Sequence, residues 1–318
     1  MSPIPVTVVT GYLGAGKTTL LNRILSEPHG KKYAVIINEF GELGIDDQLV
    51  VRADEEVFEM NNGCICCTVR GDLIRVIGGL MKRKDRFDGM IIETTGLADP
   101  APVAQTFLVD EEVKERTKLD AIVTVVDARH VLDHLGNGHE VVEQIAFADI
   151  ILLNKLDLVD ESRRAEVEAR IRALNGFAPI HQTSQCDVPL DRILDQGSFD
   201  LDRILASEPH FLDHHHHDHE SHVTSVSFST DRPIVPDKFQ NWISTLLREQ
   251  GADIYRSKGI LNVAGASKRY VFQGVHMQLQ TEWGLPWRAG DARDSRIVFI
   301  GRTLDGEALK AGFLACAK

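Results

Sequence analysis

Residues 11–18, GYLGAGKT, have the glycine and lysine spacing of a phosphate-binding loop, G-x-x-x-x-G-K-[ST]. An apolar, β-branched run at residues 6–9 precedes them and predicts a buried strand, and residues 18–25 have the apolar spacing of a helix. A strand, a glycine loop and a helix N-terminus together form an anion site. Lys17 is expected to reach the β- and γ-phosphates, and the Thr18 hydroxyl to bind Mg²⁺. The predicted nucleotide-binding residues of this segment are Gly11, Gly14, Ala15, Gly16, Lys17, Thr18 and Thr19.

A second nucleotide motif, NKLD at residues 154–157, follows the apolar run at residues 150–153, which predicts another buried strand. The Asp157 carboxylate can accept two hydrogen bonds from the N1–H and N2–H₂ edge of guanine, which adenine lacks. Lys155 is expected to lay its alkyl stem over the base, and Asn154 to tie this loop to the phosphate loop. The two motifs together favour GTP over ATP.

An acidic loop, NEFGELGID at residues 38–46, follows the buried strand that is predicted over residues 33–38. P-loop GTPases have their first switch at this place. Glu39, Glu42 and Asp46 are candidate ligands for Mg²⁺, its waters or another metal. The alternative is a solvated acidic loop without a ligand.

Another predicted strand ends in ETTG at residues 93–96. In nucleotide-binding folds an acid at this place contacts Mg²⁺ through water, and the N–H of Gly96 could reach the γ-phosphate. Asp127, at the end of the following strand, is a rival acid that we rank below Glu93. Leu97 follows the glycine, where Ras-like GTPases have a glutamine that orients the attacking water. Slow intrinsic hydrolysis, with a carboxylate orienting the water, is therefore expected. The candidate catalytic residues are Lys17, Glu93 and Glu39.

Three thiols occur within four residues, at Cys64, Cys66 and Cys67. Thiolates are soft ligands that suit zinc or copper(I), and the turn-prone residues before them would help all three reach one ion. A tetrahedral ion would still lack one ligand, and water, Glu39, Glu42, a histidine or a residue of another protein could supply it. Buried structural cysteines or a redox pair are the alternatives.

Seven of the thirteen histidines lie between His210 and His222. This polar run has no apolar periodicity and predicts an exposed linker. Above about pH 6.5 most of its imidazoles are neutral and able to coordinate zinc, nickel or cobalt. A solvated linker with incidental metal affinity is the alternative. The candidate ligands are His214, His215, His216, His217 and His219.

Strands alternate with helices up to about residue 205, which predicts an α/β domain with a mainly parallel sheet of the P-loop NTPase type and helices on both faces. Its site is expected at the carboxyl ends of the strands. Helices are predicted over residues 72–84 and 161–174, and residues 180–186 are a candidate for the loop that closes over guanine.

The linker at residues 206–222 separates domain 1–205 from a smaller α+β domain at 223–318. We find no catalytic constellation in this second domain, so a recognition role is expected. Its predicted elements are a strand at 223–228, a helix that begins at Pro236, strands at 259–263, 270–281 and 295–300, and a closing helix near residue 305.

The chain has 318 residues, a formal net charge of −12 and a pI of about 5.5. This acidity argues against a general nucleic-acid binder and against an anionic membrane surface. No apolar run approaches about 18 residues, and the N-terminal residues lack the basic region of a signal peptide. These features, with clustered rather than dispersed cysteines, predict a cytoplasmic protein.

The combined motifs resemble those of the CobW-like family of P-loop GTPases, over essentially the whole chain. The resemblance implies a GTPase that hands zinc or cobalt to a client protein, with Cys64, Cys66 and Cys67 holding the ion. Relatives supply urease and hydrogenase with nickel. Many relatives in the wider class have a lysine early in the loop that reaches across a dimer, whereas Tyr12 and Leu13 occupy this region here. The features that underlie the resemblance are GYLGAGKT, NEFGELGID, GCICC, ETTG, NKLD, the His-rich linker and the small C-terminal domain.

The leading hypothesis is GTP-coupled delivery of zinc, or of Co²⁺ or Ni²⁺, to a metal-dependent client, with Mg²⁺ as the nucleotide's ion. A GTP-binding metal buffer or sensor, cobalt delivery for cobalamin-type enzymes, and an ordinary regulatory GTPase remain open. The sequence leaves open whether the chain forms a homo-oligomer.

Overall fold

The computed structural model describes residues 3–39, 57–61, 68–82, 87–136, 138–197, 223–288 and 290–318. The chain divides into two compact units, which we call the nucleotide unit and the C-terminal unit. The nucleotide unit comprises Met1–Arg170 and Ala178–Gly197, and the C-terminal unit comprises Ile171–Phe177 and Ser198–Lys318. Within the described part of the chain, none of the helices has the length and apolarity needed to span a membrane.

The described strands of the nucleotide unit form a seven-stranded sheet in the order β3-β2-β4-β1-β5-β6-β7, and every neighbouring pair is parallel. Most of its strands are buried, as their continuous runs of valine, isoleucine and leucine predict. Strand β1 therefore lies between β4 and β5, and the loop after β1 begins at the centre of the sheet edge. The strands are β1 (Ile4–Thr10), β2 (Tyr33–Glu39), β3 (Val57–Asn61), β4 (Gly89–Glu93), β5 (Thr117–Asp127), β6 (Ile150–Asn154) and β7 (Ile180–Gln182).

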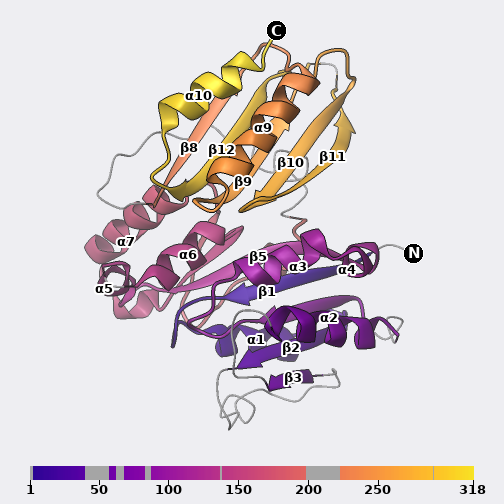
Figure 1. Ribbon diagram of the computed structural model, residues 1–318. Helices are drawn as coiled ribbons and strands as arrows, with labels where there is room; N and C mark the ends of the chain where they lie inside the picture. The colour runs from indigo at the N-terminus through magenta and orange to yellow at the C-terminus, as the bar shows by residue number, and fades with distance from the viewer. Residues whose placement is uncertain are drawn as a thin grey trace. The chain divides into compact units, whose positions relative to one another are not determined.

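Helices cover both faces of this sheet. Leu20, Leu21 and Ile24 of α1 pack with Val9 and Val123 in one buried cluster, and Figure 1 shows α2, α3 and α4 lying across the sheet. The predicted helix at residues 161–174 is present with those bounds as α7, whereas α2 begins at Thr68, earlier than predicted. The helices are α1 (Lys17–Ser26), α2 (Thr68–Met81), α3 (Ala101–Val109), α4 (Glu111–Arg116), α5 (Val131–Leu135), α6 (His139–Phe147) and α7 (Glu161–Leu174), with 3-10 turns η3 (Leu156–Leu158) and η4 (Leu190–Arg192).

The C-terminal unit is an antiparallel five-stranded sheet in the order β11-β10-β9-β12-β8 with two helices. The apolar stripe of α9 supplies Phe239 and Ile243 to a core that also contains Phe272, Phe299 and Phe313. Both predicted fold classes, a parallel α/β domain and a smaller α+β domain, are confirmed. The elements are β8 (Val223–Thr230), α9 (Pro236–Gln250), β9 (Ile254–Leu261), β10 (Lys268–Val275), β11 (Gln278–Pro286), β12 (Ser295–Arg302) and α10 (Gly306–Ala315).

One predicted strand in this unit is wrong. The run at residues 270–281 contains the end of β10, a turn and the start of β11, rather than one strand. The turn passes through His276, whose φ of 51° lies in the left-handed region. No Asn-Gly or Asp-Gly pair marks this hairpin, so its sequence lacks the usual turn signal.

Candidate nucleotide-binding site

At two positions, Gly11 and Gly16, the phosphate loop approaches its neighbours too closely for a residue other than glycine. Gly11 has a φ of 141°, and a Cβ there would lie 2.2 Å from the Val125 carbonyl oxygen. Gly16 has a φ of 118°, and a Cβ there would lie 2.6 Å from Nδ2 of Asn154. The loop is therefore packed closely against β5 and the end of β6.

The N-terminus of α1 has the features of an anion site. Its capping residue, Gly16, offers no side-chain cap, and the first turn contains no acidic residue. The Lys17 ammonium donates hydrogen bonds to the carbonyls of Gly11 at 2.8 Å and Tyr12 at 3.3 Å. These contacts hold the cation beside the loop, and the partial positive charge of the helix end adds to it. The arrangement fits a nucleotide phosphate chain, with half-buried Thr18 in the first helical turn as the residue that would hold Mg²⁺.

The ETTG segment lies directly beside this loop. Glu93, which is 6% exposed, is the register partner of Val9 in β1, and Thr94 donates to the Thr10 hydroxyl at 2.8 Å. A Cβ on Gly96 would lie 2.7 Å from the backbone nitrogen of Leu13. Glu93 and Gly96 are thus next to the phosphate loop.

The buried side chain of Gln144 in α6 fixes the position of this segment. Its Nε2 donates to the carbonyl oxygens of Gly96 and Ala98, each at 3.1 Å. Sequence reasoning missed this residue, because nothing in the local sequence distinguishes a glutamine in an amphipathic helix from a surface residue.

Asp127 lies on the other side of β1, at the end of β5, where its register partner is Asn154. Its carboxylate accepts a hydrogen bond from the Lys155 ammonium at 2.7 Å. It therefore belongs to the surroundings of the NKLD motif, and this placement favours Glu93 as the acid on the Mg²⁺ side.

The predicted tie between the two nucleotide motifs is present. Asn154 Nδ2 donates to the Ala15 carbonyl at 3.0 Å, and its Oδ1 accepts from the Cys186 backbone N–H at 2.9 Å and from the Thr183 hydroxyl at 3.2 Å. Ser184 Oγ accepts from the backbone N–H of Asp157 at 3.2 Å. The loop that follows β7 therefore lies against the NKLD motif, where a guanine-closing loop is expected.

Cys186 was not among the predicted site residues. It is buried, has a φ of 56°, and its thiol donates to the Gly16 carbonyl at 3.4 Å. Burial raises the pKa of this thiol to about 11, against the opposing charges of Arg23 and Lys155. A single cysteine far from the GCICC cluster gives no sequence signal for this packing role.

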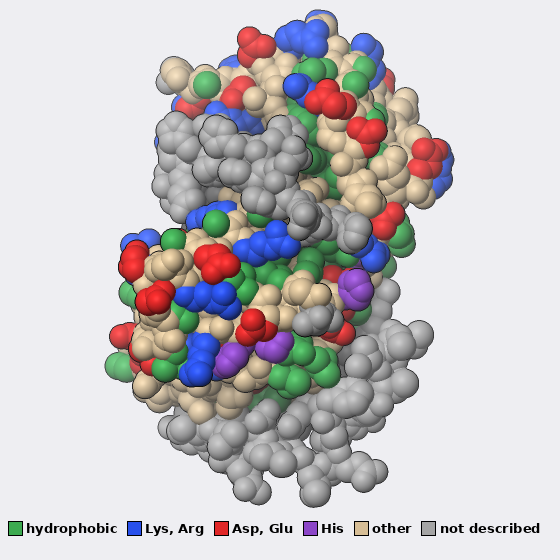
Figure 2. All heavy atoms as spheres, turned by 90° about the vertical axis from the view of Figure 1, so that its left-hand side faces the viewer, with side chains coloured by type: hydrophobic (Ala, Val, Ile, Leu, Met, Phe, Trp, Pro, Cys, Tyr) green, Lys and Arg blue, Asp and Glu red, His purple; other side chains and the backbone are tan. Residues whose placement is uncertain are grey.

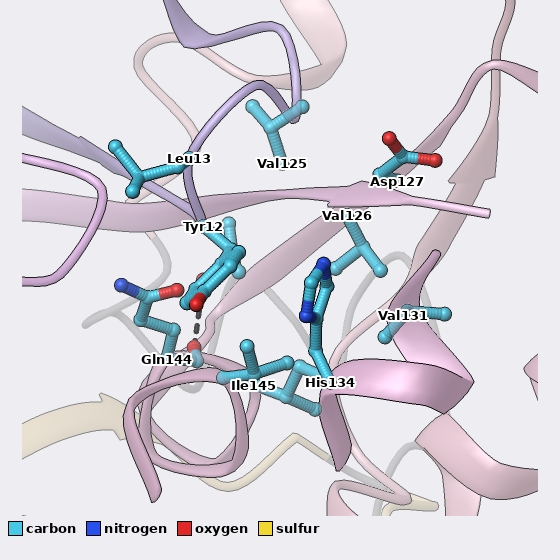
Figure 3. Close-up of a pocket in the computed structure, with 11 residues that line it drawn as sticks. Tyr12, Leu13, Val125, Val126, Asp127, Val131, His134, Gln144 and Ile145 are labelled. Carbon is cyan, nitrogen blue, oxygen red and sulfur yellow. Dashed lines mark hydrogen bonds between the residues drawn. The ribbon is translucent and has the colours of Figure 1, made fainter. Parts of the chain in front are cut away.

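A pocket adjoins the phosphate loop and is lined mainly by apolar side chains of the loop, β5, α5 and α6. Figure 3 shows Tyr12 beside His134 in it, and the two ring centroids are 4.4 Å apart. The rings of His130 and His134 are 6.4 Å apart, and Figure 2 shows histidine side chains lying close together on one face of the molecule. Tyr12 therefore packs against His134 of its own chain.

Apart from Thr18, the predicted metal ligands lie at or beyond the limits of the described residues. Glu39 ends β2, but its side chain is not described, and the other candidates lie outside the described residues. Within the described ranges, no group of three or more His, Cys, Asp or Glu side chains is placed to hold a metal ion. The candidates outside those ranges are Glu42, Asp46, Cys64, Cys66, Cys67, His214, His215, His216, His217 and His219.

The sheet topology, the glycine loop and the linked NKLD motif define a P-loop nucleotide-binding protein. Residues 5–182 match the model of the CobW/HypB/UreG nucleotide-binding domain, and residues 223–317 match the cobalamin synthesis protein cobW C-terminal domain. The chain belongs to this CobW family, as the sequence motifs predicted.

Named relatives cover both domains. The chain is 36% identical over 324 residues to the zinc chaperone YjiA of Escherichia coli, across 100% of both proteins. It is 34% identical to the zinc-regulated GTPase metalloprotein activator 1 of Schizosaccharomyces pombe, over 86% of this chain and 76% of that one. The crystal structure of zinc-bound YjiA GTPase from E. coli superposes with a TM-score of 0.80 at 31% identity, again over 100% of both chains.

Proposed function

We propose that this chain is a GTP-hydrolysing metallochaperone that binds zinc at Cys64, Cys66 and Cys67 and delivers it to a metal-dependent client. The observation that supports it most is the hydrogen bond from Asn154 to Ala15, which joins a guanine motif to a phosphate loop. Full-length similarity to proteins named zinc chaperones supports the metal part. We keep the cytoplasm as the expected compartment.

GTP would bind with its phosphates on the loop after β1 and its base at Asp157. Lys17 and the N-terminus of α1 supply positive charge to the phosphates, and Thr18 would hold Mg²⁺. Mg²⁺, when bound, neutralises charge that develops on the phosphates during transfer. Glu93 is buried beside β1. It would act on the Mg²⁺ side of the site and orient the attacking water.

The sheet register supports coupling between nucleotide and metal. Glu39 ends β2, and its register partner is Asn61, the last residue of β3. The cysteine segment lies between β3 and α2 in the sequence. A change at the end of β2 on GTP hydrolysis would therefore act on the strand that precedes the thiols, and Glu39 is one candidate for the fourth ligand.

A competitive zinc titration tests this function. The full chain, with His214–His217 and His219 replaced by Ser, is titrated without nucleotide, with GDP and with a non-hydrolysable GTP analogue. We expect at least tenfold tighter zinc binding in one guanine-nucleotide state, a coupling free energy of about 1.4 kcal/mol. By reciprocity, zinc must then change the affinity for that nucleotide by the same factor.

The matched control replaces Cys64, Cys66 and Cys67 by Ser in the same background and is expected to lose both the zinc affinity and the coupling. Coincident titration curves in all three nucleotide states would contradict gated delivery and favour a metal buffer. Zinc retention without the cysteines would contradict the assignment of the metal site.

A further inference from the structure

The Asp127 carboxylate is the centre of a hydrogen-bond cluster that the proposed reaction does not yet use. Its Oδ1 accepts from the backbone N–H groups of Arg129 at 2.9 Å and His130 at 3.3 Å. Its Oδ2 accepts from the Lys155 ammonium at 2.7 Å and is 3.0 Å from Nδ1 of His130. One oxygen thus stabilises the turn after β5, and the other faces side chains.

The cluster keeps this carboxylate charged. The side chain is only 11% exposed, and this burial opposes ionisation. The hydrogen bonds from Lys155 and His130 outweigh it, with the charge of Lys155 adding to them, and lower the pKa of Asp127 below its ordinary value. A half-buried, ionised partner therefore lies opposite the lysine ammonium.

Lys155 itself is constrained at both its backbone and its side chain. Its φ of 63° lies in the left-handed region, which disfavours residues with a Cβ. The following residue is held by the hydrogen bond from the Leu156 N–H to the Thr183 carbonyl at 3.2 Å. With the ammonium bound to Asp127, the four-carbon stem cannot sample its other rotamers freely.

We infer that Asp127 is a positioning residue for guanine-nucleotide binding, which acts by anchoring Lys155 so that its stem is already ordered to cover the base. The inference rests on the proposed GTP site and adds a residue to it. Binding that must order a flexible side chain is weakened by the lost conformational freedom, so prior anchoring of Lys155 gives up to about tenfold in affinity. Guanine selectivity would still come from Asp157.

Asp127→Asn is the informative substitution, because its amide oxygen can still accept from the N–H groups of Arg129 and His130. The substitution removes the charged contact of the other oxygen with the Lys155 ammonium, and with it the contact of that oxygen with Nδ1 of His130. GDP and the GTP analogue are expected to bind about tenfold more weakly, both by the same factor, with kcat at saturating GTP unchanged. Preference for GDP over ADP stays as in the wild type. Asp133→Asn, which removes the same charge from an exposed side chain of α5, serves as the matched control and is expected to bind as the wild type does.

A double-mutant cycle separates positioning from a structural effect. Lys155→Met keeps an apolar stem but lacks the ammonium, so adding Asp127→Asn to it should weaken binding no further. Additive losses, or an Asp127→Asn protein that binds GDP as tightly as the wild type, would overturn the inference and leave the proposed function intact. A wild-type protein that binds no guanine nucleotide would overturn the proposed function and this inference with it. If Asp127→Asn fails to fold, the GDP affinity of Lys155→Met is compared with that of the wild type instead. An unchanged affinity in Lys155→Met would overturn the inference, because it would exclude a role for the anchored ammonium.

Discussion

At the scale of single residues, the site depends on side chains that hold three loops together. Asn154 hydrogen-bonds to the phosphate loop through one amide atom and to the loop after β7 through the other. Cys186 adds a hydrogen bond from its thiol to the Gly16 carbonyl. Both side chains are buried, so a donor or acceptor that lost its hydrogen bond would lower the free energy of unfolding by about 1–3 kcal/mol. The loops therefore keep one arrangement.

The buried thiol of Cys186 predicts a loss of stability at alkaline pH. Its pKa is about 11 in the folded chain against 9.0 for an ordinary thiol. Between these values the unfolded chain has lost the proton that the folded chain retains, so raising the pH favours unfolding. The protonated Cys186 thiol thus contributes about 2–3 kcal/mol to the free energy of unfolding. This contribution is fully present below pH 9 and disappears as the pH approaches 11.

Urea unfolding at several pH values, compared between the wild type and Cys186→Ser, measures this effect. Serine does not titrate in this range, so the difference in free energy of unfolding between the two proteins should shrink as the pH rises. Cys316, whose pKa is also raised by burial, is present in both proteins and cancels. A difference that is constant from pH 8 to 11 would contradict the assignment.

At the scale of elements, β1, the phosphate loop and α1 act as one unit. The strand is buried between β4 and β5, the loop turns on residues with positive φ, and the helix packs its leucines on the sheet. The loop geometry is consequently fixed by packing on both sides before any ligand binds. This preorganisation reduces the ordering that nucleotide binding requires.

Alanine at Gly11 and alanine at Gly14 are expected to lower the free energy of unfolding by different amounts. Gly11→Ala would force a Cβ to 2.2 Å from the Val125 oxygen, whereas Gly14→Ala, at a φ of 73°, would meet no atom within 4 Å. We expect Gly11→Ala to lower the free energy of unfolding by about 3 kcal/mol or more, from strain and overlap together. Gly14→Ala should lower it by about 1 kcal/mol, from its backbone conformation alone.

Urea unfolding followed by circular dichroism measures both variants against the wild type. Equal losses would show that the close approach of the loop to β5 does not determine the stability of this element.

At the scale of the whole molecule, the buried clusters of the two units share no residue, so a probe placed in one cluster can follow that unit. All three tryptophans, Trp242, Trp283 and Trp287, lie in residues 223–318. Trp242 packs against Phe299 and Phe313, with ring centroids 6.1 and 6.2 Å away. Tryptophan fluorescence therefore reports on the C-terminal unit alone.

We predict that GDP stabilises the nucleotide unit without stabilising the C-terminal unit. At one hundred times its Kd, GDP should raise the free energy of unfolding of the nucleotide unit by about 2.7 kcal/mol. Parallel urea titrations by circular dichroism and tryptophan fluorescence measure the two transitions, with ADP as the control ligand. A fluorescence midpoint that rises with GDP would instead show that the units unfold together.

The sequence predicted what depends on local pattern. Continuous apolar runs gave the parallel strands, and glycine and lysine spacing gave the phosphate loop after β1, since both depend on contacts within a few residues. The family followed from these motifs and is confirmed by both domain matches. The hairpin at His276 was missed, because its left-handed turn has no glycine to mark it.

Only the tertiary structure decided which distant side chains meet. Asp127 and Lys155 are far apart in the chain, yet the parallel pairing of β5 with β6 brings them to hydrogen-bond distance. Cys186 and Gln144 acquire their roles in the same way, through loops and helices packed against the ends of strands. Sequence spacing determines the neighbours along one element, whereas these contacts depend on the order of strands in the sheet, which long-range packing selects.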